Sequence, residues 1–449
     1  MSKPVKISRG LDIPIKGEVK LSEKMTETPL LYALKPTDFH GIRPKVVAKQ
    51  GMHVKAGSVV FYNKFHPDVK FCSPVSGEVI DIIRGEKRKI LEIIIKSDGK
   101  QDTETFDIPN LNDAETDDIK IVLLASGLWP LILQRPFGIV PAPSDKPDAV
   151  FVSLFNTAPL APDMDFVLKD QLNDLQTGAE VIHKLTGKNI HFGLSVNSDD
   201  KLYKDIPHAE FHYFKGPHPA GNVGTQINKI RHLNKNEIIW TLKPQDLTVI
   251  GRFFRDKSYN PWRKIAFAGS ELRETFYSTV LHGASLKHIV EQYRTQDNVR
   301  IIGGDVLTGS TLNENAFLGY HDDMISVIPE GNYYELLGWA KPGFKKYTAS
   351  RNFFSWMIPG KKYRLDTNYH GGHRAYVMTG EYEKVCPLDI YPVHLIKACI
   401  TNDIDRMEEL GIYEVLEEDL ALCEFVCTSK TEVQHILRES LDMLRKELS

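Results

Sequence analysis

The chain has 449 residues, of which 42% are hydrophobic and 26% charged, and its net charge is −3. This length allows about three domains, and the composition is that of a globular protein with a sizeable core. Because the charge balance produces no global positive field, the sequence excludes nucleic acid as a general partner. Five scattered cysteines, an odd number, are typical of reduced thiols and argue against a disulfide framework.

The N-terminal residues lack the apolar core of a signal peptide. The longest uncharged apolar stretch, Ile121–Gln134, contains a proline and is shorter than the ~20 residues that a membrane span needs. We therefore expect a cytoplasmic protein that reaches a membrane only through a partner.

Short alternating apolar and polar runs with intervening turn residues fill the chain from Val46 to Ile83. This rhythm predicts a small β-sandwich, and Pro74–Val79 fits the pattern of the biotinyl/lipoyl carrier fold. A working carrier needs a lysine flanked by methionines at a hairpin tip, whereas the neighbours of Lys64 are asparagine and phenylalanine. We therefore interpret residues 1–105 as a biotinyl/lipoyl-like β-domain used for docking. Residues 84–118, which are polar, are predicted to link it to the next domain.

Strand-like and helix-like segments alternate between residues 106 and 258. The apolar run Asp148–Asn156 predicts a buried strand, Lys169–Thr186 has the apolar spacing of a helix, and Asn189–Val196 predicts another strand. Two further strands are predicted at Glu237–Leu242 and Asp246–Phe254. This alternation predicts a Rossmann-like, doubly wound and mostly parallel sheet.

The stretch Ser126–Pro141 follows an apolar run near the start of this domain, where a glycine-rich phosphate loop is often found. Trp129 and Phe137 stand where glycines would be needed, and Pro136 removes an amide donor. Arg135 is the one cation of the stretch. The sequence therefore predicts a nucleotide-type scaffold whose cofactor loop has become an apolar surface with one positive group. Core packing around the two aromatic rings is the alternative.

A second loop, Lys215–Ile230, is rich in proline and glycine and leads into a predicted helix. His218 lies in it between two prolines and is a candidate for contact with a ligand or partner, although a lone loop histidine is usually structural. Further along, Gly304 and Gly309 have the spacing of a phosphate loop, but Ser310 stands where that loop needs its lysine. We therefore predict no phosphate loop there.

The rest of the chain predicts a small α/β, ubiquitin-like domain, an irregular connection and a helical domain, over residues 259–335, 336–384 and 385–449. The pair His370 and His373 lacks further ligands at metal-site spacing. Cys423 and Cys427 are too few for an iron–sulfur cluster, which needs four ligands. We therefore predict a multidomain α/β protein with no catalytic, cofactor-binding or metal-binding residue of its own.

Seven segments occur in the order GLDIPI, SPVSG, SGLWPLILQRPF, GPHPAGNVGT, LGWAKPG, GEYEKVCPLDIYP and EEDLALCEFVC. Together they resemble the A subunits of the sodium-translocating NADH:quinone reductases (Na⁺-NQR) over nearly the whole chain. The resemblance implies a peripheral subunit, held by other subunits on the cytoplasmic side of the bacterial inner membrane. The complex passes electrons from NADH to a ubiquinone-type quinone and pumps sodium. FMN, FAD, riboflavin and iron centres are expected in partner subunits and none in this chain.

The same family is related to flavin-binding subunits of respiratory complex I and of the Rnf complex, which carry a glycine-rich flavin loop and runs of cysteines. Here the loop is replaced by GLWPLILQRPF, and the cysteines are reduced to Cys423 and Cys427. The resemblance therefore implies the fold of an electron-entry subunit without its redox groups. An isolated subunit of this kind is expected to be inactive.

A quinone head needs an apolar slot and donors to its carbonyl oxygens. Five residues are candidates for a contribution to such a site: Trp129, Arg135, Pro136, Phe137 and His218. The alternative is a purely structural scaffold that docks on the membrane subunits, with the same side chains as interface anchors. A free-standing NADH or flavin enzyme is disfavoured by the missing glycine loop.

Overall fold

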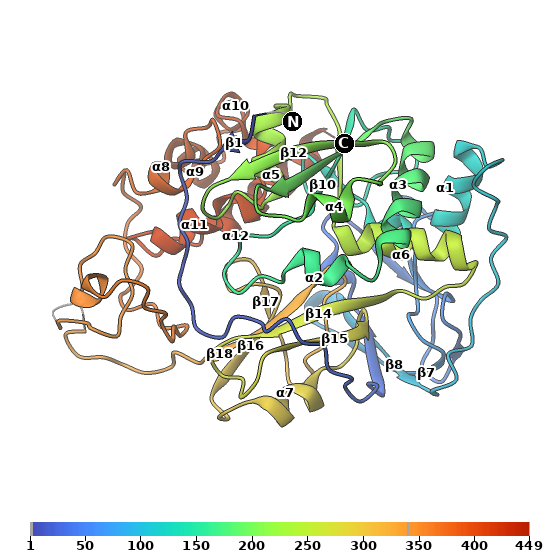
Figure 1. Ribbon diagram of the computed structural model, residues 1–449, viewed down its shortest axis with the longest axis horizontal. Coiled ribbons are helices and arrows are strands. Elements are labelled where there is room, and N and C mark those ends of the chain that lie inside the picture. Colours follow the sequence, from blue (N-terminus) through green and yellow to red (C-terminus); the bar gives the residue numbers. More distant parts are fainter. Residues whose placement is uncertain (1–2, 339–340, 449) are drawn as a thin grey trace.

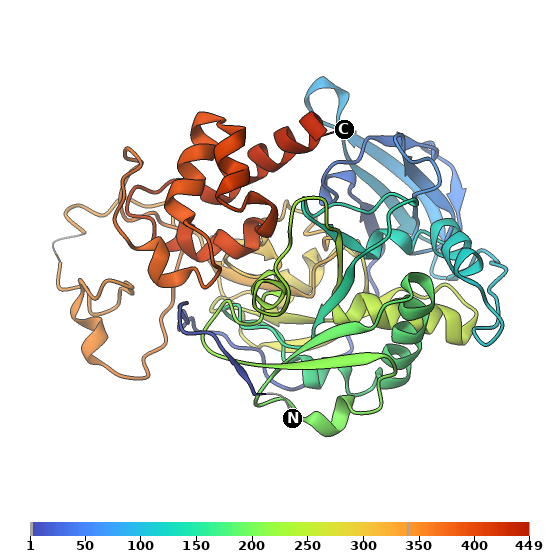
Figure 2. The same cartoon turned by 90° about the horizontal axis from the view of Figure 1, so that it is seen from above.

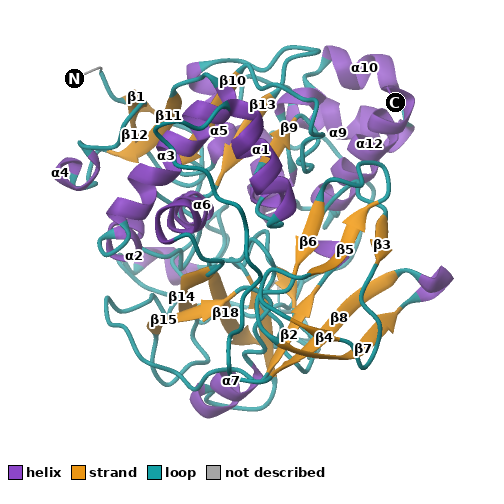
Figure 3. Ribbon diagram, turned by 90° about the vertical axis from the view of Figure 1, so that its right-hand side faces the viewer, coloured by secondary structure: helices purple, strands orange, loops and turns teal. Residues whose placement is uncertain are grey.

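A computed structural model describes residues 3–338 and 341–448. The described chain forms four sheets and a C-terminal group of helices, arranged side by side (Figure 1). Colouring by secondary structure separates the mainly β N-terminal domain from the parts in which longer helices cover a sheet (Figure 3). None of the described helices combines the length and apolar character needed to cross a membrane.

Two antiparallel sheets form the N-terminal β-domain. One has the order β2–β8–β7–β4, from strands Leu31–Leu34, Ile90–Ser97, Gly77–Arg84 and His53–Val54. The other has the order β3–β5–β6, from strands Pro44–Val46, Val59–Asn63 and Lys70–Cys72. Alternate residues of each sheet face the other, as expected for a sandwich with a shared core. The predicted β-sandwich is therefore present.

Strand β8 corrects one expectation for this domain. Residues 84–118 were predicted to be linker, but Ile90–Ser97 pairs with β2 on one side and β7 on the other. Its residues Ile93 and Ile95 are fully buried. The charged run before the strand, which made the segment look polar, is a short 3₁₀ turn at Glu86–Arg88 that joins β7 to β8.

The central sheet has six strands in the order β1–β12–β11–β10–β13–β9. They are Val5–Lys6, Ala209–Lys215, Ile190–Ser195, Ala149–Ser153, Ile239–Leu242 and Leu133–Arg135. All pairs are parallel except that of β9 with β13. The N-terminal strand β1 thus lies in this sheet and not in the β-domain.

Helices cover both faces of this sheet, as buried parallel strands require. Alternation along β10 sends Val150 and Val152 into the main core and Phe151 to the opposite face. The larger helices are α1 (Thr116–Ala125), α3 (Leu172–Thr186), α5 (Val223–Ile230) and α6 (Pro244–Asp256). Two short ones are α2 (Met164–Leu168) and α4 (Asp200–Tyr203). The finer Rossmann-like assignment stays a prediction.

Helix α6 corrects a second expectation, because Asp246–Phe254 was predicted to be a strand. Pro244 occupies the first turn, where proline favours a helix. Leu247, Ile250 and Phe254 recur at helical spacing and are all buried. Apolar residues on both sides of this helix, which packs against α3, hid that period in a continuous apolar run.

A five-stranded sheet packs beside the central one, in the order β15–β14–β18–β16–β17 (Figure 1). Its strands are Phe276–Leu281, Trp262–Ala268, Met324–Pro329, Val299–Gly303 and Ser310–Thr311, and its helix α7 is Lys287–Tyr293. The predicted small α/β domain is therefore present. Its ubiquitin-like character stays a prediction.

The C-terminal part is helical, as predicted. Its helices are α8 (Tyr382–Val385), α9 (Pro392–Thr401), α10 (Ile404–Glu409), α11 (Glu417–Val426) and α12 (Val433–Leu448). Before them the chain runs through a segment whose regular structure is one 3₁₀ turn, η4 (Phe354–Met357), within its described residues. This segment projects to the left of the helices in both Figure 1 and Figure 2.

Candidate functional site

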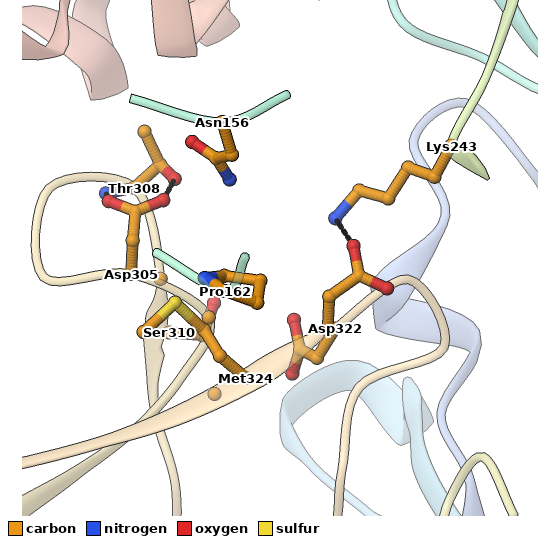
Figure 4. A pocket seen from close by; sticks show the side chains of 12 residues that line it. Asn156, Pro162, Lys243, Asp305, Thr308, Ser310, Asp322 and Met324 are labelled. Atoms are coloured by element: carbon orange, nitrogen blue, oxygen red, sulfur yellow. Dashed lines mark hydrogen bonds and ion pairs between the residues drawn. The ribbon is translucent and has the colours of Figure 1, made fainter. Parts of the chain in front are cut away.

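The order of the central sheet reverses between β10 and β13. From β10 the chain proceeds to β11 and β12 on one side, then returns to β13 on the other. In open α/β sheets, ligands bind beyond the carboxyl ends of the strands at such a switch point. A cleft of about 120 Å³ lies at this place, lined by Asn156 after β10, Lys243 after β13, and loops of the five-stranded sheet (Figure 4).

Carboxylates dominate the charge of this switch-point cleft. Asp305, Asp322 and Asp323 line it, and Lys243 is the one lysine or arginine among the lining residues. The Lys243 ammonium lies 3.0 Å from Asp323 Oδ2 and donates a hydrogen bond to the carbonyl of His321 at 2.6 Å. Burial would lower the pKa of Lys243, but the neighbouring aspartates raise it. The Lys243 ammonium is therefore already paired with Asp323. The other aspartates of the cleft leave it negatively charged, and this charge repels phosphate groups.

Trp129, the first candidate of the sequence analysis, packs in the core beside this sheet. Its indole is fully buried and meets Trp240 edge to face, with ring centroids 5.5 Å apart. Its Nε1 donates to the carbonyl of Pro141 at 2.9 Å, so the one polar group of the ring is satisfied. Trp129 lines neither the switch-point cleft nor a second hollow, beside His191.

Arg135, at the end of β9, is 2% exposed and ion-paired with the first turn of α11. Its Nη1 lies 2.8 Å from Asp419 Oδ2, and its Nη2 lies 2.6 Å from Glu418 Oε1. Burial would lower the pKa of Arg135, but the two carboxylates raise it. The guanidinium therefore remains charged and joins the edge of the central sheet to the C-terminal helices.

Pro136 and Phe137 continue this contact and are half-buried. The ring of Phe137 meets Tyr413 edge to face at 6.1 Å, and its carbonyl accepts a hydrogen bond from Arg438 Nη1 at 2.8 Å. The segment that follows Arg135 thus lies against the C-terminal helices.

His218 is 2% exposed and lies in the loop between β12 and α5. Its Nδ1 lies 3.2 Å from Thr157 Oγ1, and its backbone N–H donates to Asp12 Oδ1 at 2.9 Å. Its Nε2 is buried and has no hydrogen-bond partner among the described residues. Burial lowers the pKa of His218, while the carboxylates of Asp305, Asp12 and Asp419 act to raise it.

Asp419 is the residue that the sequence analysis missed. It pairs with Arg135, and its charge acts on His218, so it connects two of the five candidates. Its Oδ2 also accepts the N–H of Leu416, while its buried Oδ1 has no partner among the described residues. The backbone of Gly224 lies so close that a Cβ there would be 2.2 Å from Oδ1. The only sequence signal is the acidic first turn of α11, which is common at helix starts.

Four of the five cysteines lie in the C-terminal helical part, Cys399 in α9 and Cys386, Cys423 and Cys427 near α8 and α11, and all five are buried and free. A hydrogen bond with Cys423 lowers the pKa of Cys386, against the effect of burial. Burial would raise the pKa of Cys427, but Tyr382 and the backbone N–H of Thr431, which donates to its sulfur at 3.4 Å, lower it. Cys386 had not been grouped with the pair of α11. Among the described residues, no three of these sulfurs lie within 4.8 Å of one another, whereas an iron–sulfur cluster needs four ligands.

One group could hold a transition metal on ligand chemistry. His191 Nδ1 lies 3.0 Å from His212 Nε2 and 3.4 Å from Glu210 Oε2, on neighbouring strands β11 and β12. Among the described residues it is the one set of three such side chains whose ligand atoms all lie within 4.8 Å of one another. It lies at the amino ends of the strands, away from the switch-point cleft. The prediction that this chain binds no metal stays a prediction.

These features define a multidomain α/β protein: a barrel-sandwich domain, a parallel sheet with an acidic switch-point cleft, a small α/β domain and a helical end. Three family models match the chain. They are described as the NqrA N-terminal barrel-sandwich hybrid domain (residues 5–98), the NqrA second alpha/beta domain (114–258) and the NQRA C-terminal domain (264–314).

Curated relatives match from end to end. One is the A subunit of the Na(+)-translocating NADH-quinone reductase of Neisseria meningitidis serogroup A. It is 36% identical over 448 residues, covering 99% of this chain and 100% of that protein. The corresponding protein of Vibrio anguillarum is 34% identical over 446 residues, with the same coverage. The chain therefore belongs to the family of Na(+)-translocating NADH-quinone reductase A subunits.

A solved structure of an NAD+-reducing [NiFe]-hydrogenase in the air-oxidized state aligns with 76% of this chain and 62% of its own chain. The sequence identity is 11% and the TM-score 0.40.

Proposed function

We propose that this chain is the peripheral A subunit of a complex that oxidises NADH, reduces a quinone and transports sodium. It lies on the cytoplasmic side of the membrane and is held there by other subunits. The observation that carries this proposal is the full-length similarity to proteins that bear this subunit's name. In this proposal, oxidoreductase chemistry and sodium transport are activities of the whole complex and not of this subunit alone.

The chain itself carries no redox group in this proposal. The switch-point cleft offers aspartates where a flavin or nicotinamide phosphate would need donors. Its lysine is already paired with Asp323. The C-terminal cysteines form no group of three sulfurs within 4.8 Å of one another among the described residues, whereas an iron–sulfur cluster needs four ligands. The flavins and iron centres of the complex then belong to partner subunits.

The geometry favours a scaffold role over a direct quinone contact. The Nη donors of Arg135 are engaged by Asp419, Glu418 and the carbonyl of Glu414, while its buried Nε has no partner among the described residues. Breaking such a buried pair is costly, because it leaves an uncompensated charge. Arg135 is therefore assigned to the joint between the central sheet and the C-terminal helices.

A contribution to the quinone site remains the second candidate, and one observation favours it. His218 Nε2 is buried and unpartnered among the described residues, and Phe137 is half-exposed on the segment after Arg135. A buried donor without a partner is the group that a quinone carbonyl would satisfy. In this second candidate function, a partner subunit supplies the rest of the quinone site.

The test uses the assembled complex with Phe137→Ala or His218→Gln in this chain. The scaffold role predicts an unchanged KM for quinone in every complex that assembles, with any loss appearing in copurification of the subunits. A quinone role predicts a raised KM in complexes of full subunit content. If the wild-type chain fails to copurify with the other subunits, both the scaffold role and the quinone role are wrong.

A further inference from the structure

Exposed apolar side chains are concentrated in one segment, residues 333–378, which we call the arm. It holds half of the exposed large hydrophobic residues of the described chain in about a tenth of its length. They are Tyr333, Tyr334, Leu336, Leu337, Phe344, Phe354, Trp356, Met357, Ile358, Tyr369, Val377 and Met378. A concentration of this kind marks an interaction surface, since single exposed residues are otherwise scattered.

The charge of the arm is opposite to that of the remaining chain. The arm has eight Lys and Arg against two Asp and Glu, a net charge of +6, while the rest of the chain carries −9. Between Phe344 and Lys361 there is no acidic residue at all. The arm therefore combines a positive field with exposed aromatic rings.

Several of these cations are available for an outside partner. Lys341 and Lys346 pair with Glu335 at the base of the arm. Lys345, Arg351 and Lys361 have no carboxylate within ion-pair distance among the described residues. Arg351 instead lies over the ring of Trp356, at 5.8 Å from its centroid. These three unpaired cations surround the most apolar part of the arm in the sequence.

That part is the tip formed by η4 and the next residue. Phe354, Trp356, Met357 and Ile358 are each about half exposed, at 51%, 53%, 54% and 49%. Figures 1 and 2 show the arm projecting to the left of the C-terminal helices, and the exposure of these four side chains shows that the described chain leaves about half of each uncovered. Tryptophan beside arginine and lysine is the composition of segments that lie at a membrane–water interface.

We propose that the arm binds the surface of an anionic lipid bilayer, with the side chains of residues 354–358 inserted among the headgroups. The unpaired lysines and arginines contact lipid phosphates, and the aromatic rings lie at the level of the glycerol groups. The proposal rests on the proposed function for its setting, because only there does the chain lie beside a membrane. Loops of membrane proteins on the cytoplasmic side are themselves rich in lysine and arginine and would repel the arm, whereas anionic headgroups attract it.

The test is flotation of the purified full-length chain with lipid vesicles. Vesicles of phosphatidylcholine containing one third phosphatidylglycerol are compared with vesicles of phosphatidylcholine alone. We expect binding to the anionic vesicles, weakened at high salt because surface charges are then screened. The triple variant Lys345→Glu, Arg351→Glu and Lys361→Glu should bind about a hundredfold more weakly. Trp356→Ser with Ile358→Ser should weaken binding by about tenfold.

Matched controls separate the arm from general surface effects. Lys49, Lys100 and Lys287 are exposed lysines of other domains, and their triple change to Glu should leave flotation nearly unchanged. Phe65→Ser removes a ring that is 61% exposed in the β-domain and should also have no effect. Equal thermal midpoints of arm and control variants show that the fold is intact.

Three results would overturn the lipid proposal: no flotation with anionic vesicles, equal flotation with both vesicle types, or arm variants that float like the wild type. If arm variants instead lose partner subunits without any change in flotation, the arm is a protein interface. Copurification of the wild-type chain with the other subunits tests the proposed function separately, so the two failures are distinguishable.

Discussion

The guanidinium of Arg135 and the carboxylate of Asp419 lie 2.8 Å apart, although 284 positions separate them in the chain. Both side chains are almost completely buried. The pair fixes the antiparallel edge of the central sheet against the first turn of α11. It thereby holds the helical end of the molecule onto the domain that carries the switch-point cleft.

Removing the cation of this pair should destabilise the protein strongly. Arg135→Met leaves Asp419 buried without a counter-charge, at a cost of about 3–5 kcal/mol. The double variant Arg135→Met with Asp419→Leu should recover a large part of this cost, since no lone charge remains. Thermal unfolding, together with hydrogen exchange of α11, measures both effects.

The partly exposed pair of Arg300 and Glu330, with side chains 36% and 23% exposed, supplies the control for that comparison. Arg300→Met should cost less than about 1 kcal/mol, because solvent screens the pair. If Arg135→Met costs no more than Arg300→Met, the joint between the sheet and α11 does not depend on this contact.

A methyl group at position 224 should displace Asp419. Alanine in place of glycine usually stabilises a helix, but a Cβ at Gly224 would stand 2.2 Å from Asp419 Oδ1. We expect Gly224→Ala to lower the stability by about 1–3 kcal/mol, as overpacking does. Gly372→Ala, where nothing lies within 4 Å, should be neutral. Equal thermal midpoints for the two variants would contradict the close approach seen here.

The parts of the fold that were predictable are those with a local signal. The spacing of Leu175, Ala179 and Ile182 marked the position of α3, and the apolar run of β10 marked a buried strand. In α6 the apolar run was instead interpreted as a strand. A helix that is buried on most sides has no polar face, so its helical period is not visible in the sequence. Strand β8 was obscured by charges that belong to the turn before it.

The candidate site could not be predicted in full, because it is formed by contacts between residues far apart in the sequence. Arg135 was recognised as a special cation, but its partners come from a helix almost three hundred residues later. The acidic character of the cleft arises because Asp305, Asp322 and Asp323 belong to a different sheet from Lys243. Chain topology brings these groups together, so the spacing of residues in the sequence could not predict that they line one cleft.

His282 should make the protein sensitive to acid. Burial, with Arg263 nearby, lowers the pKa of this imidazole to about 3, whereas the unfolded chain titrates near 6.5. The unfolded state therefore binds the proton first, and stability is complete above pH 6.5 and is lost as the pH falls towards 3. Between pH 7.5 and 5.5 this group alone should remove about 1.4 kcal/mol.

Replacement of His282 by glutamine should flatten that part of the pH profile of thermal stability. Other groups contribute to the same acid limb, so the measured quantity is the difference between the variant and the wild type at each pH. A difference that does not change with pH would show that His282 is not the group responsible.

The five thiols should be protected in the native protein. All are buried, and burial raises the pKa of Cys72 to about 12 and that of Cys423 well above its ordinary value. The lowered pKa of Cys386 and of Cys427 favours their thiolates, but a reagent must also reach the sulfur, so a disulfide reagent should titrate few or no thiols without denaturant and all five in urea. Fast reaction of several thiols with the folded protein would contradict their burial.

The first strand of the chain cannot pair until most of the central domain has been synthesised. Val5 and Lys6 pair with Phe214 and Lys215, so β1 emerges from the ribosome long before its partner strand exists. The residues that follow pass the His218 loop, where the N–H of Leu11 donates to the carbonyl of His218, and then run along the edge strand β15 of the five-stranded sheet, where the N–H of Lys24 donates to the carbonyl of Tyr277. Strand β1 therefore stays unpaired until β12 has been made. A tag or fusion placed at this end should slow maturation of the protein more than the same addition after α12.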